Sequence, residues 1–202
     1  MMDVLEVYER PYDKEKPVVC VDEKSVPLRE EARPPIPSQP GSVKKKDYEY
    51  VRNGTANIFI AVEPKGNHRE LQVTKRRTKP DFAKFIASLV ERTYSAAEKI
   101  VVVLDNLNTH FEKSFTETFS KEKAEQILKR LEFHYTPKHA SWLNMAEIEL
   151  SILSRQCLNR SIGTQEELRR QTTAWRKKRN RKGIGITWRF TQEKAKEKFN
   201  LP

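Results

Sequence analysis

The sequence is poor in residue types that several classes of protein require. It contains only two cysteines among 202 residues, Cys20 and Cys157, and neither belongs to a C-x-x-C pair. We therefore expect neither a zinc site nor a disulfide framework, and a reducing cytosol fits best. No stretch approaches the roughly 18 apolar residues of a membrane span, and the N-terminus lacks the basic-then-apolar pattern of a signal peptide. A cytoplasmic protein without membrane contact is the expectation.

Acidic residues are also in deficit, and the deficit is uneven along the chain. Lys and Arg total 39 against 28 Asp and Glu, which gives a net charge of +11 and a pI near 9.6. Between Arg155 and Lys198 there are 14 basic and 4 acidic residues. This asymmetry predicts a polyanionic partner, most simply nucleic acid. A solvated basic face without a partner is the alternative.

Two short apolar runs that each end in an aspartate stand out in the remaining chain. Ile100–Leu104 is mostly β-branched and is followed at once by Asp105; Val18–Val21 is followed by Asp22 in the same way. Such runs are typical of strands buried on both faces, and functional groups of open α/β sheets gather at the carboxyl ends of strands. Each aspartate alone could equally form a turn or cap a helix.

If the two strands are parallel neighbours, their carboxylates converge. Adjacent strands lie roughly 4.8 Å apart, so the two negative charges would repel each other unless a divalent cation lay between them. Carboxylate oxygens with few supporting ligands suit magnesium, which keeps several waters and contacts phosphate oxygens. The pair predicts metal-assisted phosphoryl transfer.

The order of the predicted elements indicates an α/β fold. Strands are expected at Val18–Val21, Asn57–Val62, His68–Arg77, Ile100–Leu104 and Leu131–Tyr135, with helices before and after the fourth strand. This order suits a mixed five-stranded sheet flanked by helices. We expect residues 1–16 to be a connector, 17–160 the catalytic domain with a Pro-rich excursion at 27–57, and 161–202 a basic helical extension.

The helix expected from Ser141 to Gln156 supplies a third acid, with Ser141 as a plausible cap. On a helical wheel, Glu147 falls at one edge of the apolar stripe and Glu149 at the other. Either glutamate could be drawn inward, and the spacing does not decide between them. A glutamate beside a core stripe is also commonly part of an ion pair.

Three ordered blocks, Val21–Lys24, Leu104–His110 and Tyr135–Glu149, resemble the signature blocks of DDE-type transposases of the Tc/mariner superfamily, specifically the bacterial insertion sequence 630 type. The resemblance runs from about Pro17 to Phe199 and implies a ribonuclease H-like fold. By position, Asp22, Asp105 and Glu147 match the family's catalytic, metal-binding triad. The residues that match as supporting residues are Asn106, Asn108, His110, His139 and Asn144. Turn and cap hydrogen bonds are an equal explanation for these five.

The resemblance implies cut-and-paste transposition at TA dinucleotides, with two Mg²⁺ or Mn²⁺ ions held by the triad. It implies double-stranded DNA as substrate, action at the bacterial nucleoid, and a homodimer clamped by the Pro-rich excursion. Family members carry N-terminal helix-turn-helix domains that this sequence does not show. A separately encoded DNA-reading half, a truncated copy or a frameshifted fragment is therefore expected.

Two rival readings accompany the transposase. One is an inactive remnant that binds DNA or an intact transposase without cutting, and the other is a general ribonuclease H-like nuclease or resolvase. The block Trp142–Glu147 argues against the nuclease or resolvase. The complete triad favours the active transposase over the remnant, whereas the missing N-terminal region favours the remnant for behaviour in the cell.

The basic C-terminal part is expected to contain a helix from Gln165 to Lys182, with Leu168 and Trp175 on its inner side. Its end carries a basic run that is predicted to contact DNA phosphates: Arg176, Lys177, Lys178, Arg179, Arg181 and Lys182. Basic residues near a helix C-terminus are also favoured by the helix dipole, which is the structural alternative. Trp188 and Phe190 are expected to be packing anchors.

Overall fold

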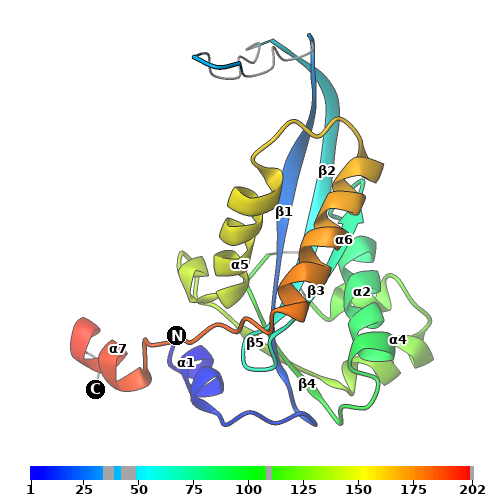
Figure 1. The fold of residues 1–202 in the computed structure, drawn as a ribbon. Helices are drawn as coiled ribbons and strands as arrows, with labels where there is room; N and C mark the ends of the chain where they lie inside the picture. Colours follow the sequence, from blue (N-terminus) through cyan, green and yellow to red (C-terminus); the bar gives the residue numbers. More distant parts are fainter. Residues whose placement is uncertain (34–38, 42–48, 108–110, 201–202) are drawn as a thin grey trace.

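A mixed five-stranded sheet with strand order β3-β2-β1-β4-β5 forms the centre of the molecule (Figure 1). The computed structural model describes residues 1–33, 39–41, 49–107 and 111–200. The strands are β1 (Val18–Glu31), β2 (Tyr50–Glu63), β3 (His68–Thr74), β4 (Ile100–Leu104) and β5 (Leu131–Tyr135). β2 runs antiparallel to β1 and β3, whereas β4 runs parallel to β1 and β5. This is the predicted α/β architecture.

Helices cover both faces of the sheet (Figure 1). One hydrophobic core packs α1 (Met2–Glu9), α5 (Met145–Leu153) and α6 (Gln165–Arg181) on one face. The other core packs α2 (Lys79–Ser88), the π-helical turn η1 (Leu89–Thr93), α3 (Lys113–Thr116) and α4 (Lys121–Leu128) on the opposite face. None of the helices within the described ranges is long and apolar enough to cross a bilayer.

The alternation of side chains explains why the central strands bury both faces. Val19 and Val21 of β1 belong to the α2 side, whereas Cys20 between them belongs to the α5 side. All five residues of β4 are buried. The expected crossover helix is also present: α2 begins at Lys79 with a capping box between Thr78 and Asp81. The crossover permits the parallel pairing of β1 with β4.

Residues 1–16 are not a plain connector as expected, because they contain the packed helix α1. Val4, Leu5 and Val7 of α1 are 0% exposed. Their spacing places three apolar side chains on one helical face, and this face completes the core beside α5.

The expected excursion at 27–57 was also wrong in its secondary structure at both ends. β1 continues past Pro27 to Glu31, and β2 begins at Tyr50, so the two strands extend as a long antiparallel arm with an irregularity between Pro27 and Arg29. Val26 and Leu28 still alternate with exposed neighbours, but no residue is buried in β1 beyond Leu28 or in the first six residues of β2, so the far end of the arm has no apolar pattern. Most of Pro34–Lys46 lies outside the described residues.

The C-terminal part is helical as expected and is integrated into the fold. Leu168 and Trp175 of α6 are buried in the core. After α6, Trp188 packs edge-on against Tyr8 of α1 at 5.3 Å between ring centroids, and Phe190 packs against Trp142 at 5.5 Å. The expectation that Trp188 and Phe190 are packing anchors is confirmed. A last helix, α7 (Gln192–Phe199), contacts α1.

Candidate active site

Asp22 and Asp105 lie beside each other at one edge of the parallel part of the sheet. The last residue pair between β1 and β4 is Cys20 with Val103, and each aspartate follows two residues later on its strand. Because side chains alternate, both aspartates are on the face of Cys20 and Val103, which α5 covers. The parallel neighbouring strands on which the expected convergence depends are therefore present in the fold.

Glu147 approaches from the first turn of α5. The short 3₁₀ turn η2 (Ser141–Leu143) leads into this helix, and Asn144 is its N-cap, accepting a hydrogen bond from Ala146 N at 3.1 Å. Asn144, not the expected Ser141, therefore starts the helix. The Asn144 Nδ2 donates to Val21 O at 2.8 Å, which ties the start of α5 to the residue before Asp22. Glu147 lies in the first turn of this helix, and its side chain is exposed.

The pKa of Asp22 reflects its burial and the negative charges around it. The pKa of its carboxyl is raised to about 7, chiefly by burial and further by the charges of Asp105, Glu23 and Glu147. A hydrogen bond from Glu23 N to Asp22 Oδ1 at 2.7 Å acts in the opposite direction. Asp105 and Glu147 are thus close enough to Asp22 for their charges to act on its ionisation.

The donor set has the chemistry of a site for hard divalent cations. Neighbouring carboxylates repel one another, and a cation bound between them relieves that repulsion. Carboxylate oxygens are also ligands that Mg²⁺ and Mn²⁺ prefer. Across the described ranges, no three His, Cys, Asp or Glu side chains lie close enough to hold one ion as they stand. Glu147 is exposed and its side chain has three rotatable bonds, so packing does not fix the position of its carboxylate.

Glu149 lies in the opposite environment to Glu147. Its side chain is 0% exposed and contacts two arginines. Arg69 of β3 is also 0% exposed, and its Nε lies 3.0 Å from Glu149 Oε1. Arg179 of α6 is 11% exposed. Arg179 Nε and Nη2 bind both Glu149 oxygens at 2.8 and 3.1 Å. The two glutamates therefore have unlike surroundings: Glu149 joins three elements, whereas Glu147 is exposed and its charge acts on Asp22.

Two of the residues expected to support the triad, Asn106 and Asn144, make hydrogen bonds with the backbone. Asn106 donates to Thr136 O at 3.1 Å, which connects the segments that follow β4 and β5. Asn144 caps α5, and His139 is exposed in the loop before it with a positive φ of 64°. These contacts fit the alternative of turn and cap bonding. Asn108 and His110 lie outside the described residues.

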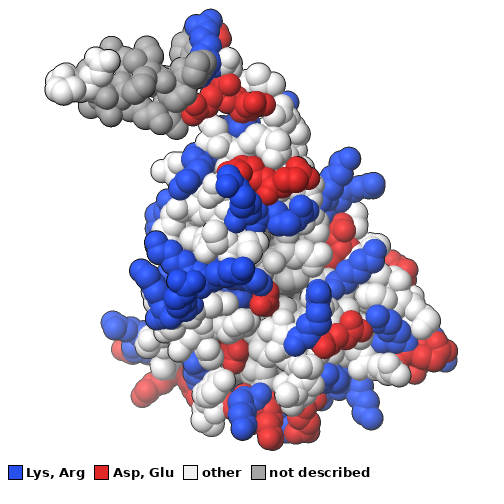
Figure 2. All heavy atoms as spheres, turned by 45° about the vertical axis from the view of Figure 1, so that its right-hand side comes forward, with Lys and Arg blue, Asp and Glu red and all other residues white. Residues whose placement is uncertain are grey.

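The basic run at the end of α6 divides into two groups. Arg176 pairs with Glu70, and Arg179 pairs with Glu149, so both arginines hold α6 against the rest of the fold. The other four, Lys177, Lys178, Arg181 and Lys182, are exposed. Figure 2 shows Lys and Arg side chains spread over the face that it presents, with acidic side chains among them.

Tyr8 is a positioning residue that sequence reasoning missed. Its buried hydroxyl donates to Leu143 O at 2.7 Å and lies 3.5 Å from Cys20 Sγ. It therefore connects α1 to the turn before α5 and to the strand that carries Asp22. The regular spacing of apolar residues in α1 was a signal for a packed helix, but no local pattern points to these partners.

Comparison with known proteins places these features in context. Residues 17–169 match the family described as DDE superfamily endonuclease. Among solved structures, the chain is similar to one titled "Crystal structure of the Mos1 Strand Transfer Complex", with a TM-score of 0.50 and 14% identity over 90% of this chain. The chain spans about half of that protein, 54% of its length. This likeness confirms the ribonuclease H-like fold. A search of curated proteins gave no match.

Proposed function

We propose that this chain, which belongs to the DDE superfamily endonuclease family, is the catalytic domain of a DNA transposase of the Tc/mariner superfamily, of the bacterial insertion sequence 630 type. The observation that carries the proposal is the arrangement of Asp22, Asp105 and Glu147 on three elements around one edge of the sheet. All three lie within the matched residues. Their order and the blocks around them are the ones that the resemblance predicts.

In this proposal, Asp22, Asp105 and Glu147 hold two Mg²⁺ or Mn²⁺ ions. When bound, such a pair activates a water or a DNA 3′-hydroxyl and stabilises the leaving oxygen of the cleaved phosphodiester. The chain contributes the arrangement of the ligands: the β1–β4 pairing sets the two aspartates side by side, and the Asn144 bond to Val21 O orients the helix that carries Glu147. No covalent bond between DNA and protein is needed.

The finer parts of the proposal follow from the resemblance. They are excision and reinsertion at TA dinucleotides, action on double-stranded DNA at the nucleoid, and a homodimer joined through the segment around residues 27–57. The lysines and arginines left exposed at the end of α6 would contact DNA phosphates. A separately encoded half would then read the ends of the element.

The test is nicking of supercoiled plasmid by the purified chain in Mg²⁺ or Mn²⁺. We expect nicking that EDTA stops and that Asp105→Asn abolishes, because one of the carboxylates that hold the cation is then neutral. Glu125→Gln removes an exposed carboxylate on α4, across the sheet, and should leave nicking unchanged. DNA binding without metal-dependent nicking would contradict the proposal and favour the inactive remnant.

A further inference from the structure

The charged residues that line a groove beside the candidate active site are all basic. It lies between β1 and the end of the α5 helix, where the π-helical turn η3 (Ser154–Leu158) continues α5, and its volume is about 510 Å³. Four charged residues within the described ranges line it: Lys24, Arg29, Arg155 and Arg160. All four are basic, and polar side chains such as Ser25 and Asn159 lie between them.

The groove begins next to the aspartate on β1. Lys24 follows Asp22 by two residues on the same strand, so both side chains are on the α5 face of the sheet. Arg155 follows Glu147 by about two helical turns on the continuous segment of α5 and η3. The groove therefore leads away from the carboxylates along the arm formed by β1 and β2.

Backbone and side-chain hydrogen bonds fix the walls of the groove. Arg29 N donates to Ile162 O at 2.8 Å, which joins the arm to the segment after η3. Asn53 Nδ2 of β2 donates to Gly163 O at 3.1 Å and strengthens the same connection. Ile162 is buried in the core. The basic side chains thus extend from a framework that is already assembled before any ligand binds.

Two acidic side chains near the groove have partners of their own. Glu30 accepts a hydrogen bond from Asn53 Nδ2 at 3.2 Å. Hydrogen bonds from Gln171 and Arg170, together with the charge of Arg160, lower the pKa of the Glu167 carboxyl. Glu167 pairs with Arg170, with 2.9 Å between Arg170 Nε and Glu167 Oε2. Arg29 stacks on the ring of Tyr50, with its guanidinium carbon 4.6 Å from the ring centroid. Stacking leaves the edge of a guanidinium free to donate hydrogen bonds to an anion.

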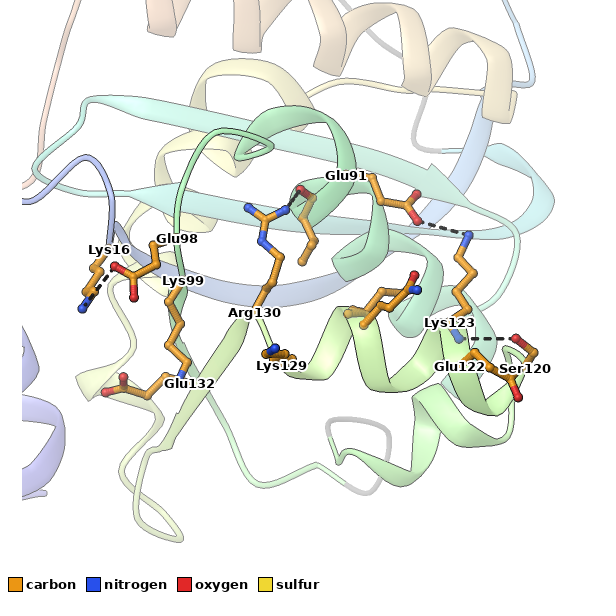
Figure 3. Close-up of a pocket in the computed structure, with 13 residues that line it drawn as sticks. Lys16, Glu91, Glu98, Lys99, Ser120, Glu122, Lys123, Lys129, Arg130 and Glu132 are labelled. Atoms are coloured by element: carbon orange, nitrogen blue, oxygen red, sulfur yellow. Dashed lines mark hydrogen bonds and ion pairs between the residues drawn. The ribbon is translucent and has the colours of Figure 1, made fainter.

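A larger hollow elsewhere in the fold provides a contrast (Figure 3). It has a volume of about 1150 Å³ and lies at the opposite end of the sheet, where Lys99 precedes β4 and Arg130 precedes β5. Its acidic and basic residues alternate and pair, as in Lys16–Glu98 and Lys123–Glu91. Arg130 is occupied by the carbonyl oxygens of Val90 and Tyr94. Acidic side chains line this hollow, whereas the charged residues that line the groove are all basic.

We infer that the groove formed by Lys24, Arg29, Arg155 and Arg160 binds the sugar-phosphate backbone of DNA and guides it to the carboxylates. The inference rests on the proposed function for its choice of DNA. Four cations on a preformed wall match the regular negative charges of a phosphate backbone, which are read without regard to sequence. The groove also takes over part of the role that the sequence assigned to Arg176 and Arg179, because internal ion pairs hold those two side chains.

The test is binding of a short fluorescein-labelled DNA duplex by the full chain in EDTA, measured by anisotropy across a salt series. Affinity falls as salt rises, and each phosphate contact contributes about −0.9 to the slope of log affinity against log salt. Arg155→Gln combined with Arg160→Gln should therefore make the slope shallower by about 2 and weaken binding roughly ten-fold at about 100 mM salt.

The matched control is Lys84→Gln combined with Lys129→Gln. It removes the same charge from exposed positions on α2 and after α4, across the sheet from the groove. This control should bind within about two-fold of the wild type, because only long-range charge is lost and salt screens it.

Three results would overturn the inference. The first is a groove variant that binds DNA with the affinity and salt slope of the wild type. The second is a control variant that loses as much as the groove variant. The third is binding of polyglutamate that depends on Arg155 and Arg160 when DNA binding does not, which would identify an acidic protein segment as the occupant. Because EDTA removes any catalysis, groove-dependent binding with no nicking in metal would refute the proposed function alone.

Discussion

Glu147 and Glu149 are two residues apart and have unlike surroundings. Glu147 is exposed beside the aspartates, whereas Glu149 is enclosed between Arg69 and Arg179. A helical wheel places both at the edge of the apolar stripe, so the sequence left the choice open. The partners of Glu149 are 80 and 30 residues away in the chain, and no local pattern reveals such contacts.

Substitution of each glutamate by glutamine should separate the two environments. Glu149→Gln leaves two largely buried guanidinium groups without their counter-charge, so it should lower the free energy of unfolding by about 3–5 kcal/mol. Glu147→Gln should leave stability within about 0.5 kcal/mol of the wild type and abolish nicking. Urea denaturation and the plasmid assay measure the two effects. Similar stability losses in both variants would contradict this assignment.

The raised pKa of Asp22 makes stability depend on pH when no metal is bound. The folded state keeps a proton up to about pH 7, whereas the unfolded state releases it near pH 4. The unfolded state therefore binds fewer protons between these values, and the free energy of unfolding falls as pH rises through them.

Asp22→Asn should remove this dependence, because an amide does not ionise. The free energy of unfolding of the variant minus that of the wild type should therefore be larger at pH 8 than near pH 4, by on the order of 2–4 kcal/mol. Denaturation in EDTA at several pH values measures it. Mg²⁺ should narrow the difference by stabilising the ionised carboxylate of the wild type. An advantage that does not change with pH would contradict the account.

At the scale of elements, α1 connects two other parts of the site. Tyr8 reaches both Cys20 of β1 and Leu143 before α5. The sequence was interpreted as a connector in this stretch because it is short and charged. Its helical structure depends on packing: the apolar face of α1 is covered by the core, and isolated helices of this length are marginal in water.

Tyr8→Phe should test the link between α1 and α5. The substitution keeps the ring and leaves the buried Leu143 O without its donor, so a loss of about 1–3 kcal/mol in the free energy of unfolding is expected. Tyr12→Phe removes a hydroxyl that hydrogen-bonds Glu63 from a side chain that is 56% exposed. Water can replace that bond, so this control should change stability by less than about 1 kcal/mol. Equal effects of the two substitutions in urea denaturation would show that the buried bond has no special role.

At the scale of the whole molecule, the sequence predicted the central architecture better than its margins. The five strands, the β2–β3 hairpin and the parallel pairing of β1 with β4 followed from apolar runs, turn residues and a crossover of suitable length. The extension of β1 beyond Pro27 did not follow, because a proline interrupts the run and only Leu28 is buried beyond it. The aspartate pair was predicted from strand ends, whereas the groove depends on η3 and β1 meeting across the fold.

The burial of Glu149 also sets an order of events during synthesis. Arg69 has left the ribosome before α5 is made, but Arg179 is made 30 residues after Glu149. A nascent chain that ends before α6 is complete therefore holds Glu149 with one of its two arginine partners. The helix that carries Glu147 therefore gains the second partner of its buried Glu149 only when α6 has been made and packed against it. Until then, the helix lacks one of the ion pairs that hold it in the fold.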